Sequence, residues 1–172
     1  MLKKYFGLIL LSVLMTACTV TSKNTTPKTI FVSPNGNNDN SGLTINDPFL
    51  TINHAVDIAA PGDTVYLLPG KYREIINLNS KNGEADKPIC IFGYSNDKNN
   101  YPVIDGGLVK PSDSAENYWM VFDNSNWVKV GRIKFKNGWR DPIQIDNSSF
   151  ISFNRCMFWG ARRSQGLVID AS

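Results

Sequence analysis

Residues 124–135 read NSNWVKVGRIKF, and residues 147–158, 23 positions further on, read NSSFISFNRCMF. Asparagine, serine, arginine and phenylalanine recur identically between the two segments, and most of the other apolar positions stay apolar. Each segment holds two short runs in which apolar residues alternate with others, which is the periodicity of β-strands. A repeat of roughly twenty residues built on short strands is typical of solenoid folds.

Two classes of solenoid have repeats of this length, the leucine-rich repeats and the β-helices. The Leu-x-x-Leu-x-Leu pattern is absent, and the runs are rich in Val, Ile, Phe and Trp. The sequence therefore predicts an all-β parallel β-helix with three strands per coil. The strands are expected at residues 29–33, 64–68, 75–78, 89–92, 103–105, 119–122, 127–130, 132–135, 143–146, 150–153, 155–158 and 167–170.

A solenoid needs a cap, because its end exposes apolar side chains and strand edges. Residues 51–60 predict a short N-terminal capping α-helix, with Thr51 as N-cap and an apolar stripe at helical spacing. His54, the only histidine, falls on the polar face of this helix, which favours a solvated side chain over a catalytic one. The loop at 34–42 has Asn, Asp and Ser at alternate positions, as in a calcium loop, but it lacks the closing acidic residue, so a structural turn is favoured.

The N-terminus predicts export from the cytoplasm. Residues 1–17 combine a basic start, an apolar run and small residues directly before Cys18, which together resemble the signal peptide of a bacterial lipoprotein. Cys18 would then carry the lipid, and the polar residues 18–28 would form a tether. We expect a lipid-anchored protein of the bacterial envelope, at the outer membrane or cell surface. A plain signal peptide, giving a secreted protein, and an uncleaved anchor are the alternatives.

Charge and cysteine content narrow the function classes. Cleavage before Cys18 removes Lys3 and Lys4, which leaves 16 basic against 15 acidic residues and a net charge of +1. So small a net charge gives no support to nucleic-acid binding, which needs a concentrated basic face. Cys90 and Cys156 stand where apolar residues are expected, so they are interpreted as buried thiols rather than a disulfide.

The N-terminal half carries a more specific pattern. The segments that form it are IFVSPNG at 30–36, PFLTI at 48–52, PGDTVY at 61–66, PGKYRE at 69–74, KPICI at 87–91 and PVIDG at 102–106. This succession resembles the N-terminal cap and first coils of secreted right-handed parallel β-helix proteins of the pectate-lyase-like superfamily. The group that it resembles most is the family 9 polysaccharide lyases.

The resemblance implies activity on a uronic-acid polymer. In such lyases calcium neutralises the uronate carboxylate, a lysine or arginine removes the neighbouring proton, and the glycosidic bond breaks by β-elimination. The family's calcium site uses four acids in an Asp-Gly and an Asp-Asp-Gly-x-Asp motif. Only Asp141 of these is present at the matching positions, and the catalytic base would fall beyond Ser172. Calcium is therefore a weak expectation, catalytic residues cannot be assigned, and it stays open whether the chain is an enzyme.

The 23-residue repeat also aligns Arg140 with Arg163, and Trp139 with Arg162. Like charges stacked one coil apart are unfavourable unless an anion bridges them, and arginine suits carboxylates. Arg140, Arg162 and Arg163, with Trp139 and Trp159 as sugar-stacking faces, are thus candidate substrate-binding residues. The alternative is structural: the arginines pair with Asp141 or Asp146, and the tryptophans pack.

The 23-residue repeat also aligns Asp123 with Asp146, which would place their two carboxylates one coil apart. This pair could bind a cation, or Lys129 or Arg132 could balance it.

Three functions remain open at this point. The chain could be the N-terminal part of a polysaccharide lyase, a non-catalytic module that binds acidic glycan or holds an envelope component, or an inactive truncated lyase. No capping element follows the strand expected at 167–170, so we expect the domain at 29–172 to be C-terminally incomplete and prone to end-to-end self-association.

Overall fold

Strands dominate the computed structural model, which describes residues 26–107, 119–138 and 143–160. The helices are α1 (Ile52–Ile58) and the 3-10 turn η1 (Lys98–Asn100). The strands are β1 (Thr29–Val32), β2 (Thr64–Leu67), β3 (Lys71–Tyr72), β4 (Ile76–Asn79), β5 (Ile89–Gly93), β6 (Val103–Asp105), β7 (Met120–Asp123), β8 (Asn126–Gly131), β9 (Lys134–Lys136), β10 (Ile143–Asp146), β11 (Ser149–Asn154) and β12 (Met157–Trp159).

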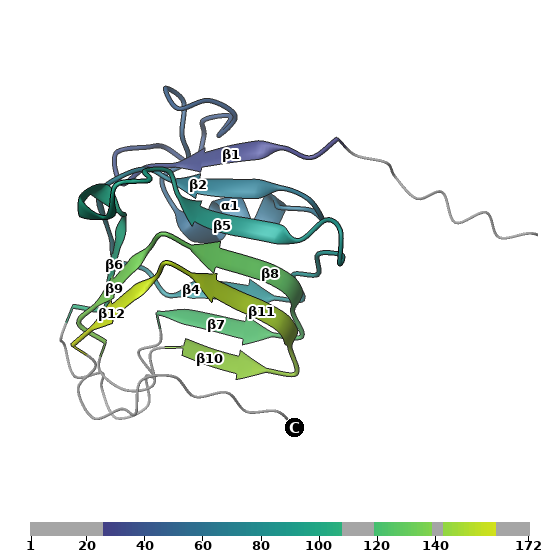
Figure 1. Ribbon diagram of the computed structural model, residues 1–172. Coiled ribbons are helices and arrows are strands. Elements are labelled where there is room, and N and C mark those ends of the chain that lie inside the picture. The colour runs from purple at the N-terminus through teal and green to yellow at the C-terminus, as the bar shows by residue number, and fades with distance from the viewer. Residues whose placement is uncertain (1–25, 108–118, 139–142, 161–172) are drawn as a thin grey trace, which may run out of the picture.

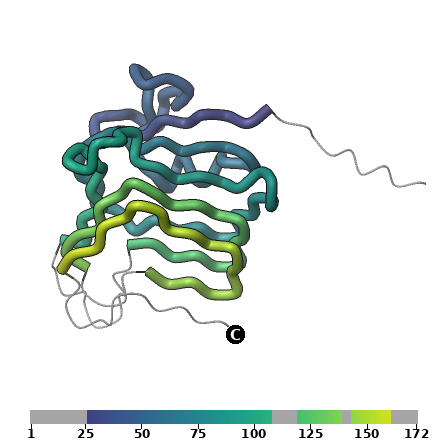
Figure 2. Tube along the Cα trace, in the orientation of Figure 1, coloured from purple at the N-terminus to yellow at the C-terminus, as the bar shows by residue number. Residues whose placement is uncertain are grey.

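Parallel pairing joins these strands into three sheets (Figure 1). Sheet A has the order β1-β2-β5-β8-β11, sheet B the order β12-β9-β6-β3, and sheet C the order β10-β7-β4. The chain visits sheets C, A and B in turn, so β7, β8 and β9 form one coil and β10, β11 and β12 form the next. Figure 2 shows the coils stacked along one axis, from β1 at one end to β10 at the other. The predicted parallel β-helix with three strands per coil is confirmed.

The 23-residue repeat is the register between the last two coils. Ile143 pairs with Met120, Ile151 with Val128, and Met157 with Lys134, each exactly one repeat apart in the numbering. Because identical positions stack, their inward side chains form rows in one apolar core that includes Trp119, Phe122 and Phe135.

The corners of these coils use left-handed backbone, and they also repeat. Positive φ angles occur at Asn124 and Asn147 (49° and 45°), at Trp127 and Phe150 (55° each), and at Arg132 and Arg155 (57° and 53°). Asparagine adopts this conformation readily, but it costs most other side chains roughly 1–2 kcal/mol. The predictions that strands begin at Arg132 and Arg155 are therefore wrong. Both arginines form the corner between sheets A and B.

Helix α1 covers the first coil, as predicted, but it is shorter than the predicted span. Thr51 is its N-cap and accepts a hydrogen bond from the backbone N–H of His54. The carboxylate of Glu74 accepts two more, from the backbone N–H groups of Ile52 (2.9 Å) and Asn53 (3.1 Å). The helix is thereby fixed to the first coil through its free N–H groups.

His54 is less exposed than the sequence predicts, because a residue of the loop before α1 packs against it. The imidazole is half-buried and packs edge-on against Phe49, with ring centroids 4.6 Å apart. The predicted solvated histidine is therefore only partly correct, because Phe49 packs against its ring. In that loop Asn38 Oδ1 accepts hydrogen bonds from the backbone N–H groups of Leu50 and Thr51, which supports the structural turn.

Both described cysteines are free thiols, and both are half-buried rather than fully buried. Burial raises the pKa of each thiol.

Strand β3 was not predicted, and the strand expected at 167–170 lies outside the described residues. Neither described helix is long and apolar enough to span a bilayer.

Candidate functional site

Sheet C presents a row of three oxygen-bearing side chains on its outer surface, called the acidic row below: Asn79, Asp123 and Asp146. Asn79 in β4 pairs in register with Asp123 in β7, which pairs in turn with Asp146 in β10. Inward and outward residues alternate along each strand, and the neighbours Leu78, Phe122 and Ile145 are in the core. The two carboxylates and the amide therefore point outward, with strands about 4.8 Å apart.

The acidic pair in this row is not neutralised within the described part of the chain. Asp123 accepts a hydrogen bond from Asn124 Nδ2 (3.0 Å), and Asp146 accepts one from Gln144 Nε2. The two ion pairs of the described residues are elsewhere: Lys71 with Asp105, and Lys87 with Glu84.

The alternative that Lys129 or Arg132 balances the pair is not found, because neither forms an ion pair with Asp123 or Asp146 among the described residues. Lys129 lies in β8 of sheet A, and Arg132 donates to Asn96 Oδ1 at the corner between sheets A and B.

A hard cation fits this row in part. Calcium takes about six to eight oxygen ligands, mostly from carboxylates, amides and water. Asp123, Asp146 and Asn79 supply oxygens of the right kind from three adjacent strands. Within residues 26–107, 119–138 and 143–160, however, no three His, Cys, Asp or Glu side chains are grouped closely enough to hold a metal ion. The row would need oxygens from a bound ligand or from other residues to complete a calcium shell.

Most of the residues predicted for the site lie outside the described residues. They are Cys18, Trp139, Arg140, Asp141, Arg162 and Arg163. Trp159 is described and ends β12 in sheet B, where it is 46% exposed. Lys136, its register partner in β9, places its ammonium 5.1 Å from the centroid of the indole ring. Trp159 thus lies on a different sheet from the acidic row, and a cation already covers part of its ring.

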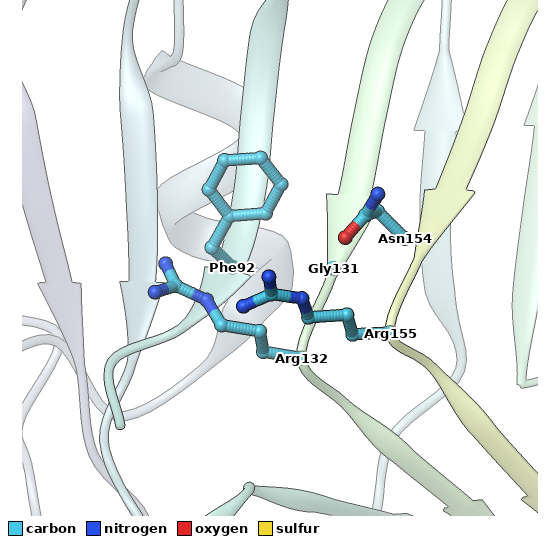
Figure 3. A pocket seen from close by; sticks show the side chains of 5 residues that line it. All are labelled: Phe92, Gly131, Arg132, Asn154 and Arg155. Carbon is cyan, nitrogen blue, oxygen red and sulfur yellow. The ribbon is translucent and has the colours of Figure 1, made fainter. Parts of the chain in front are cut away.

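A second arginine pair was missed by the sequence analysis. Arg132 and Arg155 line a pocket of about 280 Å³ together with Phe92, Gly131 and Asn154. Figure 3 shows the two guanidinium groups side by side, both extending toward the coil that carries Phe92. The available signal was the identical arginine in the two repeat segments, which was interpreted as part of a strand.

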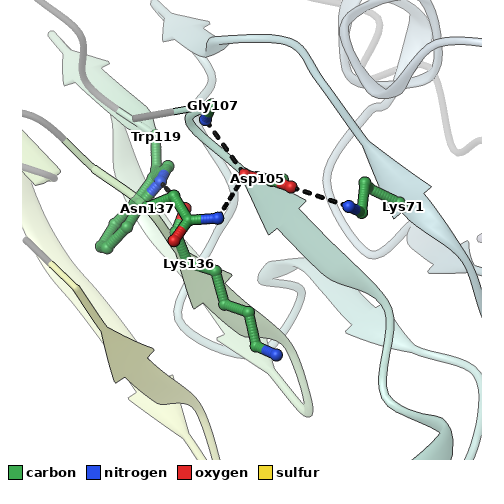
Figure 4. A network of polar contacts seen from close by, with 6 residues as sticks. All are labelled: Lys71, Asp105, Gly107, Trp119, Lys136 and Asn137. Carbon is green, nitrogen blue, oxygen red and sulfur yellow. Dashed lines mark hydrogen bonds and ion pairs between the residues drawn. The ribbon is translucent and has the colours of Figure 1, made fainter. Parts of the chain in front are cut away.

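Polar contacts at the end of sheet B tie three coils together (Figure 4). Asp105 in β6 accepts hydrogen bonds from Asn137 Nδ2 (2.9 Å) and the backbone N–H of Gly107 (3.0 Å), and pairs with Lys71 Nζ at 3.0 Å. Burial opposes the charged form of this carboxyl group, but the hydrogen bonds and the lysine outweigh it and lower the pKa of Asp105 to about 2. Since every partner stabilises a buried carboxylate between coils, this network is structural.

Nearly the whole chain after the proposed tether matches a known protein family. A family model described as "Pel9A-like, right handed beta helix region" matches residues 30–172. The match confirms the resemblance drawn from the N-terminal segments, and it gives the β-helix its right-handed sense.

Two curated proteins are similar to part of the chain. The pectate lyase PEL9 of Emericella nidulans is 38% identical over 78 residues, which cover 45% of this chain and 18% of that protein. The uncharacterized protein YwoF of Bacillus subtilis is 40% identical over 68 residues, covering 40% of this chain and 14% of that protein. The chain therefore matches less than a fifth of the length of either relative.

A solved structure gives the same fold. A rhamnogalacturonan lyase superposes with a TM-score of 0.52 over 81% of this chain and 43% of that chain, at 19% sequence identity. At this level of identity the likeness shows the β-helix and nothing more.

Proposed function

The chain belongs to the Pel9A-like right-handed β-helix family, and from this premise we propose that it is an exported lipoprotein whose β-helix binds or acts on an acidic polysaccharide. If the protein is catalytic, its reaction is β-elimination of a uronate polymer. The observation that carries the proposal is the family match, which spans residues 30–172 and so nearly the whole chain after the proposed tether. A related protein of this fold is a pectate lyase, and pectate is a uronate polymer.

The acidic row on sheet C supports a cation-dependent version of this function. A polyanion is repelled by Asp123 and Asp146 unless a cation lies between them. Calcium, when bound there, would neutralise the carboxylates of both the protein and the sugar. Asn79 would contribute a neutral oxygen beside them, and the uronate itself would complete the shell that the row leaves open.

We propose that the arginines and tryptophans named from the sequence bind the sugar chain. Arg140 lies in the segment between β9 and β10, and we propose that it and Arg163 bind uronate carboxylates. Trp139 and Arg162 would contact the same chain. Trp159, at the end of sheet B, would offer the part of its indole face that Lys136 leaves uncovered.

A non-catalytic role is the second candidate, and one observation favours it. Among the residues that the structure describes, no lysine or arginine forms an ion pair with Asp123 or Asp146, and the two ion pairs present lie elsewhere. The chain would then be a glycan-binding or structural module of the envelope.

Product formation separates the two candidates. The purified chain is incubated with pectate, alginate and chondroitin, with calcium and with a chelator, and the absorbance of unsaturated uronate ends is followed. Affinity electrophoresis on the same polymers measures binding. Calcium-dependent unsaturated ends support the lyase, and retardation without product supports the binding module. A chain that does neither on any of the three polymers contradicts the proposal.

A further inference from the structure

The corner between sheets A and B carries two stacked arginines. Arg132 follows β8 and Arg155 follows β11, and the residues just before them, Gly131 and Asn154, are register partners. Both arginines have left-handed backbone, with φ of 57° and 53°. Because the corners stack in the same way as the strands, the two side chains leave the solenoid one coil apart and in the same direction (Figure 3).

Neither guanidinium is neutralised by the described part of the protein. Arg132 Nη1 donates to the amide oxygen of Asn96 at 2.6 Å, and no described carboxylate lies within 4.0 Å of either arginine. Two like charges about one coil apart repel each other unless an anion lies between them. Within the described residues, the corner therefore carries two positive charges that no carboxylate of the protein balances.

Aromatic rings form the wall beside this positive pair. The guanidinium carbon of Arg132 lies 5.3 Å from the ring centroid of Phe92 and 5.9 Å from that of Tyr66. Tyr66 and Tyr94 pack edge-to-face at 5.6 Å, and Tyr94 is 46% exposed. Phe92 and the two arginines line a pocket of about 280 Å³. Such a combination of guanidinium and aromatic surface suits a ligand with a carboxylate and an apolar ring face.

We propose that this corner is a second binding site for acidic sugar, in which Arg132 and Arg155 together hold one uronate carboxylate and Phe92 contacts the sugar ring. The identification of the ligand as a uronate rests on the proposed function. The site itself is separate from the acidic row, because it lies between sheets A and B whereas the row lies on sheet C. A polysaccharide could thus be held on one side of the solenoid while another segment of it contacts sheet C.

The left-handed backbone determines which variant is informative. Asparagine adopts this conformation readily, as Asn124, Asn137 and Asn147 do in the same solenoid. Arg132→Asn with Arg155→Asn therefore removes both charges without adding strain to the corner. Arg132→Lys with Arg155→Lys keeps the charge but removes the planar fork that binds a carboxylate bidentately. Lys28→Ala with Lys87→Ala removes two positive charges from exposed positions elsewhere and serves as the control.

Binding of galacturonate tetramer to the purified chain tests the proposal, with the arginine side-chain N–H signals in nitrogen-15 spectra as the local readout. We expect the signals of Arg132 and Arg155 to shift with the tetramer and not with its neutral methyl ester. The double asparagine variant should bind at least about tenfold more weakly, since a bidentate charged contact is lost. The double lysine variant should fall between it and the wild type, and the control should bind like the wild type.

Other outcomes overturn the proposal. They are unmoved arginine signals, an equal response to the methyl ester, or undiminished binding by the asparagine variant. The failure of the proposed function is distinguishable from these. Arginine signals that shift in a chain that forms no unsaturated ends leave this site standing and remove the lyase. Unsaturated ends formed at an unchanged rate by the asparagine variant, with unmoved arginine signals, remove this site and leave the lyase.

Discussion

Trp127 and Phe150 stack face to face one coil apart, with ring centroids 3.8 Å apart and ring planes within 3° of parallel. Both residues have a φ of 55°, so each ring is attached to backbone that disfavours side chains. Two effects of similar size therefore oppose each other here. Stacked aromatic rings contribute about 0.5–1.5 kcal/mol, and a left-handed non-glycine residue costs roughly 1–2 kcal/mol.

This balance predicts different outcomes for two substitutions at Phe150. Phe150→Ala removes the stack and keeps the strain, so it should lower the free energy of unfolding by about 1 kcal/mol. Phe150→Gly removes both, so it should be closer to neutral. Urea unfolding of the two variants measures the difference. If glycine is as destabilising as alanine, backbone strain does not contribute at this corner.

Glu74 should be important for the cap although its side chain is on the first coil. Its carboxylate accepts hydrogen bonds from the backbone N–H groups of Ile52 and Asn53 at the start of α1. Glu74→Ala leaves both without this partner and should cost about 1–2 kcal/mol of unfolding free energy. Glu84→Ala is the control, because Glu84 is exposed and pairs only with Lys87 at 3.8 Å, and it should change stability by less than about 0.5 kcal/mol. Equal losses in the two variants would show that α1 does not depend on this contact.

Acid titration should expose the role of Asp105. Its folded pKa of about 2 lies below the ordinary value of 3.8, so its contribution to stability is complete above pH 3.8 and is lost as the pH falls toward about 2. Over this interval the wild type should lose on the order of 1–2 kcal/mol more than Asp105→Asn, a range reduced because Lys71 is exposed. Chemical unfolding at a series of pH values measures both proteins. Parallel pH dependences would mean that Asp105 titrates normally in the folded state.

The sequence predicted the register of the last two coils well, because the repeat places identical residues over one another. Ser125 and Ser148, for example, are 23 apart, and Ser148 Oγ accepts a hydrogen bond from the backbone N–H of Ser125. The corners were harder to predict. An arginine in an alternating apolar run has the pattern of a strand, and nothing in the residue type of Arg132 indicates left-handed backbone.

The pocket at the second arginine pair could not be found from the sequence. Phe92 meets Gly131 across one coil, yet the two are 39 positions apart because residues between β6 and β7 lengthen that coil. Between β2 and β5 the same step takes 26 positions, as from Thr64 to Cys90. With coils of unequal length, a single repeat distance does not give the register, so contacts between the early and late coils require the structure.

Lipid attachment at Cys18 remains a prediction with a direct test. Cys18→Ala should abolish incorporation of radiolabelled palmitate in a bacterial host and leave an unprocessed precursor or a soluble form. Cys90→Ala is the control, because Cys90 is a half-buried thiol of β5 and should leave labelling unchanged. Undiminished labelling of the Cys18 variant would rule out this anchor.

Calcium should act on the acidic row in a way that depends on Asp146. Without divalent cations, Asp123 and Asp146 are like charges on adjacent strands, so Asp146→Asn should raise the free energy of unfolding by a few tenths of a kcal/mol to about 1 kcal/mol. The gain should shrink at high salt, because the carboxylates are partly exposed and are screened. If the row binds calcium, the order reverses when the ion is added. A ligand present at a hundred times its dissociation constant stabilises the folded state by about 2.7 kcal/mol, and the variant has one carboxylate fewer to bind it.

Thermal unfolding of wild type and variant, with chelator and across a calcium series, would show this crossing. Asp86→Asn removes an exposed carboxylate far from the row in sequence and should respond to calcium as the wild type does. Magnesium, which demands a smaller octahedral shell and gives up its water reluctantly, should stabilise the wild type less than calcium. Stabilisation of Asp146→Asn equal to that of the wild type would place any calcium elsewhere. In that case the two carboxylates of the acidic row would only repel each other, and a polysaccharide would have to bind without a calcium ion there.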